Sequence, residues 1–253
     1  MTEWEWPFLA IFFLLGLTLG SFFNVVIYRC PRQLNVAKGR SFCPDCRHRL
    51  GCWDLVPLFS FLCLGGRCRY CRAKISWRYP LVEFLTGAGL ALLFFFFGLS
   101  LPFFQWAILY LLLIPLFFID LEHQLLPDSI TLPGIVIGLA FQIVQGFWWQ
   151  SLLGMAIGGV LFGLIYFLWK GGMGAGDIKL ALMLGAFLVY PLVIPWFLLS
   201  FLIGAVGGIM GMVVFGLKGK SAIPFGPYMA LAALMVAFWG QPMVSWYLQL
   251  IGF

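Results

Sequence analysis

Long apolar stretches separated by short polar links dominate the pattern along this chain. Eight stretches have the length of helices, at about 8–28, 80–98, 102–119, 129–147, 151–169, 177–189, 191–217 and 224–239. An apolar helix of roughly 20 residues crosses a bilayer. The alternation of period two that a transmembrane barrel requires is not seen in the sequence. The pattern therefore predicts an all-α polytopic membrane protein with about eight transmembrane helices.

The sixth apolar stretch is shorter than the others. At about 1.5 Å per residue it reaches roughly 20 Å, which is less than a ~30 Å hydrocarbon core. We expect this helix to begin inside the membrane, with the glycine-rich link 171–176 against a cavity. The final stretch, 241–253, is expected to be amphipathic or interfacial.

Composition excludes a soluble domain, because 63% of the residues are hydrophobic and only 9% are charged. The positive charge is unevenly placed. Eleven of the fifteen Lys and Arg residues lie between Arg29 and Arg78, and the other four are Lys170, Lys179, Lys218 and Lys220. If segment 29–79 is cytoplasmic, all of these residues lie on one side and both termini lie outside. A basic patch can also bind nucleic acid, but the segment shows no recognition helix, so we expect the lipid bilayer and no nucleic acid as partner.

Two CxxC pairs, separated by 21 residues, lie in the polar segment after the first helix. Their cysteines are Cys43, Cys46, Cys68 and Cys71. Four thiolates at this spacing can bind Zn²⁺ tetrahedrally, and a metal would help a segment with little apolar core to fold. Two disulfides or a redox-active CxxC remain alternatives, although a cytoplasmic loop lies in a reducing compartment.

Two aspartates lie at the cytoplasmic ends of apolar helices. Asp120 ends the third helix and Asp177 begins the sixth, so the topology brings both to one membrane depth. Adjacent carboxyl groups share a proton, because both cannot ionise cheaply. One can activate water while the other protonates a carbonyl oxygen, which is aspartic-protease chemistry. Gly174 and Gly176 would leave room beside Asp177 for an extended substrate backbone.

Helix capping is the alternative interpretation of such residues. Asp177 can cap the sixth helix and Asp128 the fourth, and for Asp128 capping is favoured. A purely structural interpretation is weaker for Asp120, because the dipole at a helix C-terminus disfavours negative charge. Glu83, one turn into the second helix, can pair with a basic residue such as Arg78 or Lys179, or help to position a substrate.

The order of these motifs resembles that of the bacterial type IV prepilin peptidases over nearly the whole chain. The shared motifs are GSFFNVVIYR at 20–29, the two CxxC pairs, SWRYPLVE at 76–83, the link 120–128 and GAGD at 174–177. GxGD alone would be weak evidence, but five motifs in order are specific.

The resemblance implies a bifunctional enzyme of the bacterial cytoplasmic (inner) membrane. Such enzymes cleave the short basic leader of type IV prepilins or pseudopilins, after a glycine at the cytoplasmic face. They then N-methylate the new N-terminal residue with S-adenosylmethionine. Asp120 and Asp177 carry over as the catalytic pair, the four paired cysteines as Zn²⁺ ligands, and Gly66 as a residue linked to methylation. We expect Gly174, Gly176, Glu83 and Asp128 to position the substrate.

This interpretation divides the chain into three parts: a first transmembrane helix (1–28), a cytoplasmic four-cysteine zinc-binding domain (29–79) and a membrane-embedded aspartic peptidase domain (80–253). Three alternatives remain: a leader peptidase that does not methylate, a carboxylate-based transporter, and a scaffold protein of a pilus or secretion machine. A transporter should show internal repeats and acidic residues near the bilayer midplane, and the sequence shows neither.

Overall fold

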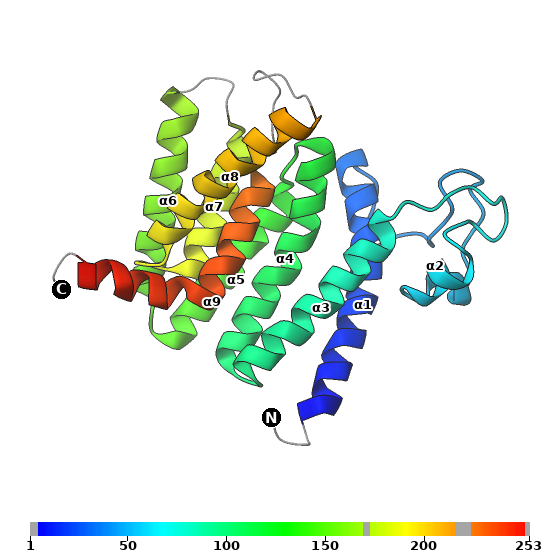
Figure 1. Cartoon of the computed structure of the whole chain (residues 1–253), viewed down its shortest axis with the longest axis horizontal. Helices are drawn as coiled ribbons and strands as arrows, with labels where there is room; N and C mark the ends of the chain where they lie inside the picture. The colour runs from blue at the N-terminus through cyan, green and yellow to red at the C-terminus, as the bar shows by residue number, and fades with distance from the viewer. Residues whose placement is uncertain (1–4, 169–172, 216–223, 251–253) are drawn as a thin grey trace. The chain divides into compact units, whose positions relative to one another are not determined.

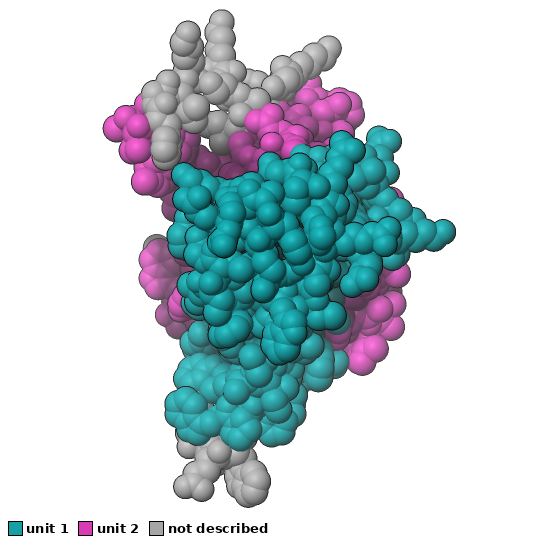
Figure 2. All heavy atoms as spheres, turned by 90° about the vertical axis from the view of Figure 1, so that its right-hand side faces the viewer, with its two compact units in different colours: residues 1–115 teal, residues 116–253 magenta. Residues whose placement is uncertain are grey.

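The computed structural model describes residues 5–168, 173–215 and 224–250. Within these ranges the regular structure is helical, and the only β pairing is two isolated bridges, Phe42–Arg49 and Arg67–Lys74. The all-α prediction is therefore confirmed. The chain forms two compact units, residues 1–115 and 116–253, coloured teal and magenta in Figure 2. The three-part functional division at 28/29 and 79/80 stays a prediction.

Figure 1 labels the α-helices in chain order. Unit 1 contains α1 (Glu5–Arg29), the short 3₁₀ turns η1 (Cys30–Arg32) and η2 (Cys52–Leu55), α2 (Phe59–Cys63), α3 (Arg78–Phe97) and the larger part of α4 (Leu101–His123). Unit 2 contains the end of α4 with α5 (Asp128–Gln145), α6 (Trp148–Leu168), α7 (Ala175–Leu188), α8 (Val193–Phe215) and α9 (Gly226–Leu250).

Seven of the helices in the described residues are long and apolar enough to cross a membrane. The exceptions are α2 and α7. Helix α7 has 14 residues, which correspond to about 21 Å, so it is short in the way that the sequence predicts.

Two predicted helix ends are wrong. Helix α4 continues past Asp120 to His123, because nothing in this apolar run breaks the helix before Gln124, which has a φ of 51°. Helix α9 includes Pro242 and continues to Leu250, because a proline inside a transmembrane helix removes one backbone hydrogen bond without ending the helix. Some predicted features lie outside the described residues. They are the end of the seventh predicted helix at 216–217, link residues 171–172, residues 251–253, and Lys170, Lys218 and Lys220.

In unit 1, α1 packs along α3. The side-chain amide of Asn24 donates to the Tyr79 carbonyl across this contact, at 3.1 Å. At the end of α1, the buried guanidinium of Arg29 donates to five backbone carbonyls between Asn35 and Arg40. Hydrogen bonds replace the water that a buried charge loses, so Arg29 orders the loop that leads toward the cysteines.

In unit 2, α7 is the buried helix and packs against α5, α6 and α9. The carbonyls in the last turn of a helix have no partner within the helix. Here the Gln142 amide of α5 donates to the Phe187 carbonyl at 3.0 Å, and the Ser151 hydroxyl of α6 donates to the Ala186 carbonyl at 2.8 Å. These polar contacts fix one end of α7, and Asp177 lies at the other end.

Candidate functional site

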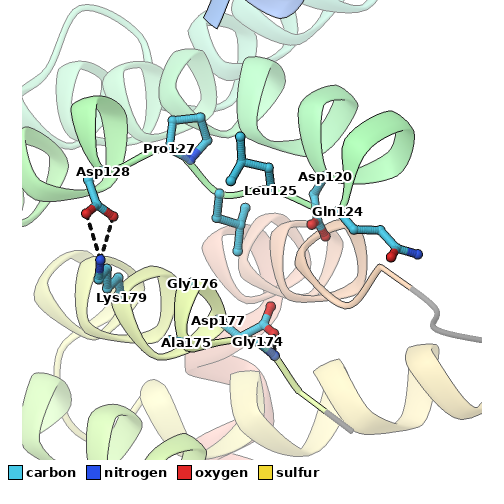
Figure 3. Close-up of a pocket in the computed structure, with 11 residues that line it drawn as sticks. Asp120, Gln124, Leu125, Pro127, Asp128, Gly174, Ala175, Gly176, Asp177 and Lys179 are labelled. Carbon is cyan, nitrogen blue, oxygen red and sulfur yellow. Dashed lines mark hydrogen bonds and ion pairs between the residues drawn. The ribbon is translucent and has the colours of Figure 1, made fainter. Parts of the chain in front are cut away.

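A pocket of about 560 Å³ lies within unit 2 (Figure 3). It is lined by residues 120 and 124–128, from the end of α4 to the start of α5, and by residues 174–177 and 179, from the start of α7. Asp120, Asp128, Gly174, Gly176 and Asp177 all line it. The structure therefore brings together five of the predicted site residues from three places in the sequence.

Asp177 is the third residue of α7 and is buried. Its Oδ2 accepts a 2.9 Å hydrogen bond from the backbone N–H of Gly174, which occupies the N-cap position. Asp177 therefore does contribute to capping, as the alternative interpretation held, but from inside the helix. This contact uses one carboxylate oxygen, and a carboxylate has a second oxygen that can act on another molecule.

Asp120 lies in the last turn of α4 and is also buried. The carbonyl end of α4 disfavours a negative charge there. The first residue of α9 offsets this effect, because the Gly226 N–H donates to Asp120 Oδ2 at 2.9 Å. A hydrogen bond to a charged group contributes about 1.5–3 kcal/mol, so the start of α9 stabilises the carboxylate that α4 disfavours.

Gly226, which contacts the candidate catalytic residue Asp120, is not among the site residues that the sequence predicts. A Cβ atom at this position would lie 2.7 Å from Asp120 Oδ2, so any side chain would displace the carboxylate. The signal in the sequence is a glycine between two prolines, in PFGP at 224–227. Its partner lies 106 residues earlier in the chain, and no local pattern identifies such a partner.

Asp128 does not cap α5, so that favoured interpretation is wrong. Pro127 occupies the N-cap position, and its carbonyl accepts the first backbone bonds of the helix. The Asp128 carboxylate instead accepts two 2.7 Å hydrogen bonds from Lys179 Nζ, drawn as dashed lines in Figure 3. Both side chains are partly exposed. This ion pair joins α5 to α7 on the wall of the pocket.

The two glycines before Asp177 differ in their surroundings. A Cβ at Gly176 would lie 3.0 Å from the Leu126 Cβ, so this glycine lets α7 approach the α4–α5 link. A Cβ at Gly174 would meet only Asp177 Oδ2, at an ordinary 3.5 Å, and the Gly176 amide nitrogen at 3.9 Å. A role for both in admitting a substrate backbone stays a prediction.

Unit 1 contains a second candidate site, a cluster of four thiols. The Sγ atoms of Cys43, Cys46, Cys68 and Cys71 all lie within 4.8 Å of one another, and Cys43 and Cys71 are 3.9 Å apart. Tetrahedral zinc with Zn–S bonds of about 2.3 Å places sulfur atoms about 3.8 Å apart. The cluster can therefore hold such an ion after small movements.

The two CxxC loops share one backbone pattern. The Cys43 N–H donates to the His48 carbonyl and the Arg47 N–H donates to the Cys43 carbonyl. In the second loop, the Cys68 N–H donates to the Ala73 carbonyl and the Arg72 N–H donates to the Cys68 carbonyl. In each loop the residue after the second cysteine has a positive φ, 57° for Arg47 and 61° for Arg72. Paired loops of this kind present four sulfur atoms to one point, which two unrelated disulfides would not require.

The thiols ionise unequally without a cation. Burial opposes ionisation of Cys68, but backbone amides of Cys71 and Tyr70 outweigh it and lower the pKa of Cys68 to about 7. The Ala73 amide favours the Cys71 thiolate, yet desolvation and the neighbouring thiols raise the pKa of Cys71 to about 12. Four thiolates at this distance need a cation between them, so the donor set fits a divalent metal such as zinc.

Asp54 ties the second CxxC loop to η2. Its carboxylate accepts hydrogen bonds from Arg69 Nε at 2.7 Å, from the Tyr70 hydroxyl at 3.0 Å and from the Gly51 amide at 3.0 Å. Arg69 and Tyr70 are the two residues between Cys68 and Cys71. Desolvation opposes ionisation of the Asp54 carboxyl group, but the three donors outweigh it and lower the pKa of Asp54. The Asp54 carboxylate is therefore charged at neutral pH. Outer contacts of this kind orient metal ligands.

Glu83 and Gly66 both lie in unit 1. Glu83 Oε2 accepts a 2.9 Å hydrogen bond from the backbone N–H of Leu58, just before α2. Gly66 has a φ of +66°, and a Cβ there would lie 3.1 Å from the ring of Phe61 in α2. Lys179, one expected partner of Glu83, binds Asp128 instead. Glu83 is thus bound to the residue that precedes α2, and Gly66 lies against α2 itself.

Comparison with known proteins gives one consistent family. Residues 14–97 match the model of the bacterial peptidase A24 N-terminal domain, and residues 107–209 match that of the type IV leader peptidase family. A prepilin leader peptidase/N-methyltransferase of Pseudomonas aeruginosa is 35% identical, over 95% of this chain and 93% of the relative. A protein of the same name from Aeromonas salmonicida is 38% identical, over 97% of this chain and 96% of the relative. Another from Myxococcus xanthus is 42% identical, over 84% of this chain and 66% of the relative. No solved structure matches the chain.

Metal content tests the thiol cluster. We expect the purified protein to contain about one zinc ion per chain, because four thiolates complete a tetrahedral site. Cys68→Ser should abolish this binding, because Cys68 is a buried member of the cluster. Cys63→Ser is the matched control, since Cys63 is exposed and lies outside the cluster. Elemental analysis by mass spectrometry is the measurement, and equal zinc in both variants would contradict the assignment.

Proposed function

The chain belongs to the type IV leader peptidase family, and from that premise we propose that it cleaves the leaders of type IV prepilins or pseudopilins and methylates the new N-terminus. The matches to the two family models together cover most of the chain, and relatives named for both activities align along nearly all of it. The alternative of a transporter is not favoured. A leader peptidase without methylation is the second candidate, and the names of the relatives disfavour it.

One observation carries the proposed cleavage: two buried aspartates line a single pocket, and each is held by a backbone N–H on its Oδ2 atom. Two carboxyl groups beside one another favour a state in which one is ionised and the other protonated. The ionised group takes a proton from water while the water oxygen attacks the scissile carbonyl carbon. The protonated group donates to the carbonyl oxygen, which gives a gem-diol. As the C–N bond breaks, the leaving amine takes the proton that the first group removed from water, and a diol hydroxyl returns a proton to the second group.

The surroundings of the pair suit a peptide substrate. Pockets of about 300–1,000 Å³ bind ligands of moderate size, and this pocket has about 560 Å³. Leu125, Leu126 and Pro127 give it an apolar wall, whereas Asp128 and Lys179 supply charge. Asp128 in this proposal positions the substrate together with Gly174 and Gly176.

Methylation needs a methyl donor, which the proposal identifies as S-adenosylmethionine. Bound S-adenosylmethionine would supply the methyl group that replaces one hydrogen of the amine freed by cleavage, with S-adenosylhomocysteine and a proton as the other products. A zinc ion on Cys43, Cys46, Cys68 and Cys71 would hold the two CxxC loops together. Gly66 contributes a turn next to the second loop.

The protein is a multi-pass membrane protein, and we place it in the bacterial cytoplasmic membrane. The Lys and Arg residues then lie at the cytoplasmic face with the active site, and both termini lie outside. The distribution of charge in the sequence supports this orientation. The pocket and the contacts of its aspartates involve the end of α4 and the starts of α5, α7 and α9, all in unit 2. This orientation assigns those helix ends to the cytoplasmic face.

Mass spectrometry of a prepilin incubated with the purified enzyme tests both activities. Loss of the leader, and a gain of one CH₂ mass only when S-adenosylmethionine is present, are the expected results. Loss of the leader alone would favour the peptidase without methylation. An uncut cognate prepilin, with the enzyme shown to be folded, would contradict the proposal.

Substitution of the aspartates tests their role. Asp120→Asn and Asp177→Asn should each lower kcat for cleavage by at least about 10²–10⁴-fold, because an amide cannot exchange the proton. Thermal unfolding in detergent should show that both variants stay folded. Cleavage at the wild-type rate by either variant would remove that residue from the catalytic pair.

Gly226→Ala tests the amide that holds Asp120. The added Cβ would displace Asp120 Oδ2, and a misplacement of about 1 Å can cost about 10²-fold in rate. We expect a loss of kcat with KM unchanged, since the interaction serves the reacting groups. Gly163→Ala in α6 is the matched control, because a Cβ there meets nothing within 4 Å. Equal kcat values for the two variants would refute the role of Gly226.

A further inference from the structure

The five-residue helix α2 lies in the most apolar run of segment 29–79. It belongs to the run VPLFSFLCL at 56–64, within a segment that is otherwise polar and basic. One face of α2 points inward, where Phe61 is buried, packs on the Trp77 ring at a centroid distance of 4.9 Å and contacts the position of Gly66. This inner face attaches α2 to the second CxxC loop.

The opposite face of α2 is apolar and exposed. Phe59, Leu62 and Cys63 are spaced i, i+3 and i+4, so they share one side of the helix. Phe59 is 60% exposed and Leu62 is 71% exposed, and nearby Trp77 is 74% exposed. A helix in water presents polar residues on its exposed face. Helix α2 instead presents apolar residues on its exposed face as well as on its buried face.

The attachment of α2 to α3 indicates its depth. Leu58, which immediately precedes α2, donates its backbone N–H to Glu83 Oε2. Glu83 is five residues beyond Arg78, where the candidate membrane span Arg78–Phe97 begins, which corresponds to about 7–8 Å along the helix. Amphipathic helices that lie in a membrane surface bury their apolar face by about 5–10 Å. Leu58 is thus held beside the first turns of a span.

The positive charge in the segment around α2 complements an anionic membrane surface. Residues 29–78 contain eleven Lys and Arg residues and only two acidic residues, Asp45 and Asp54. Such basic segments next to transmembrane helices are attracted to anionic lipid headgroups. Tryptophan, here Trp77 at the start of α3, is enriched where helices enter the headgroup region.

We propose that α2 is an interfacial helix, with Phe59, Leu62 and Cys63 inserted in the headgroup and upper acyl region of the leaflet beside α3. The occupant of the apolar face is lipid. Segment 29–79 is then docked on the membrane through α2. The close approach of Gly66 to Phe61 then also helps to place α2 in the membrane surface, because a side chain at Gly66 would shift the inner face of this helix.

Thiol accessibility in proteoliposomes of phosphatidylethanolamine and phosphatidylglycerol tests the proposal. Cys63 is a natural reporter on the exposed face. Ala37→Cys provides a reference thiol at an exposed position in the polar loop that Arg29 holds. Metal-loaded protein is treated either with a sulfonated, membrane-impermeant maleimide or with an apolar maleimide that partitions into lipid. Peptide mass mapping then gives the reaction rate at each cysteine.

Insertion in the interface should slow the reaction of Cys63 with the impermeant reagent at least about tenfold relative to the reference thiol in the Ala37→Cys protein. The apolar reagent should remove most of that difference. Leu62→Asp should raise the reactivity of Cys63 toward the impermeant reagent, because a charge opposes insertion, with metal content unchanged as the check on folding. Equal reaction of both thiols with the impermeant reagent would overturn the proposal. So would failure of Cys63 to react with either reagent, since protein would then cover it.

Discussion

The hydrogen bonds that anchor two buried carboxylates are the interactions on which the proposed chemistry depends. A buried carboxylate needs donors, because burial removes its water. Here both donors are backbone N–H groups of glycines at helix starts, Gly174 for Asp177 and Gly226 for Asp120. A backbone donor carries no side-chain freedom of its own, so the positions of the carboxylates follow those of helices. The geometry of the pocket is therefore set by how α4, α7 and α9 pack.

Helix α7 shows how the rest of unit 2 supports this arrangement. It is too short to span a bilayer alone, and it is enclosed by longer helices. Gln142 and Ser151 bind two carbonyls of its last turn, and the Asp128–Lys179 pair joins its N-terminal half to α5. A helix fixed at both ends can present a carboxylate at one depth, whereas a lipid-exposed helix could tilt or slide. In unit 1, the residue before α2 is bound to α3 through Glu83, and Phe61 of α2 lies next to Gly66, just before the second CxxC pair.

The extent to which the sequence predicts these features depends on how local they are. Apolar runs identify the spans, and CxxC spacing identifies the cluster that the structure assembles. Asp120 and Asp177 are placed together because topology and charge constrain depth. The contact of Gly226 with Asp120 and the pairing of Asp128 with Lys179 were not predicted, since each joins distant segments through packing. The end of α4 was misjudged because the polar residues after Asp120 resemble a link, yet the backbone stays helical to His123.

The most direct measurement of the central claim is the affinity of a prepilin-derived peptide in which a hydroxyethylene group replaces the scissile amide. This group mimics the tetrahedral intermediate that Asp120 and Asp177 would stabilise together. An enzyme binds such a mimic more tightly than the substrate, by about 10²-fold or more. The account predicts this preference in the wild-type protein and its loss in Asp120→Asn and in Asp177→Asn. Equal affinity for the mimic and the unmodified peptide in the wild-type protein would contradict a shared catalytic role for the two aspartates.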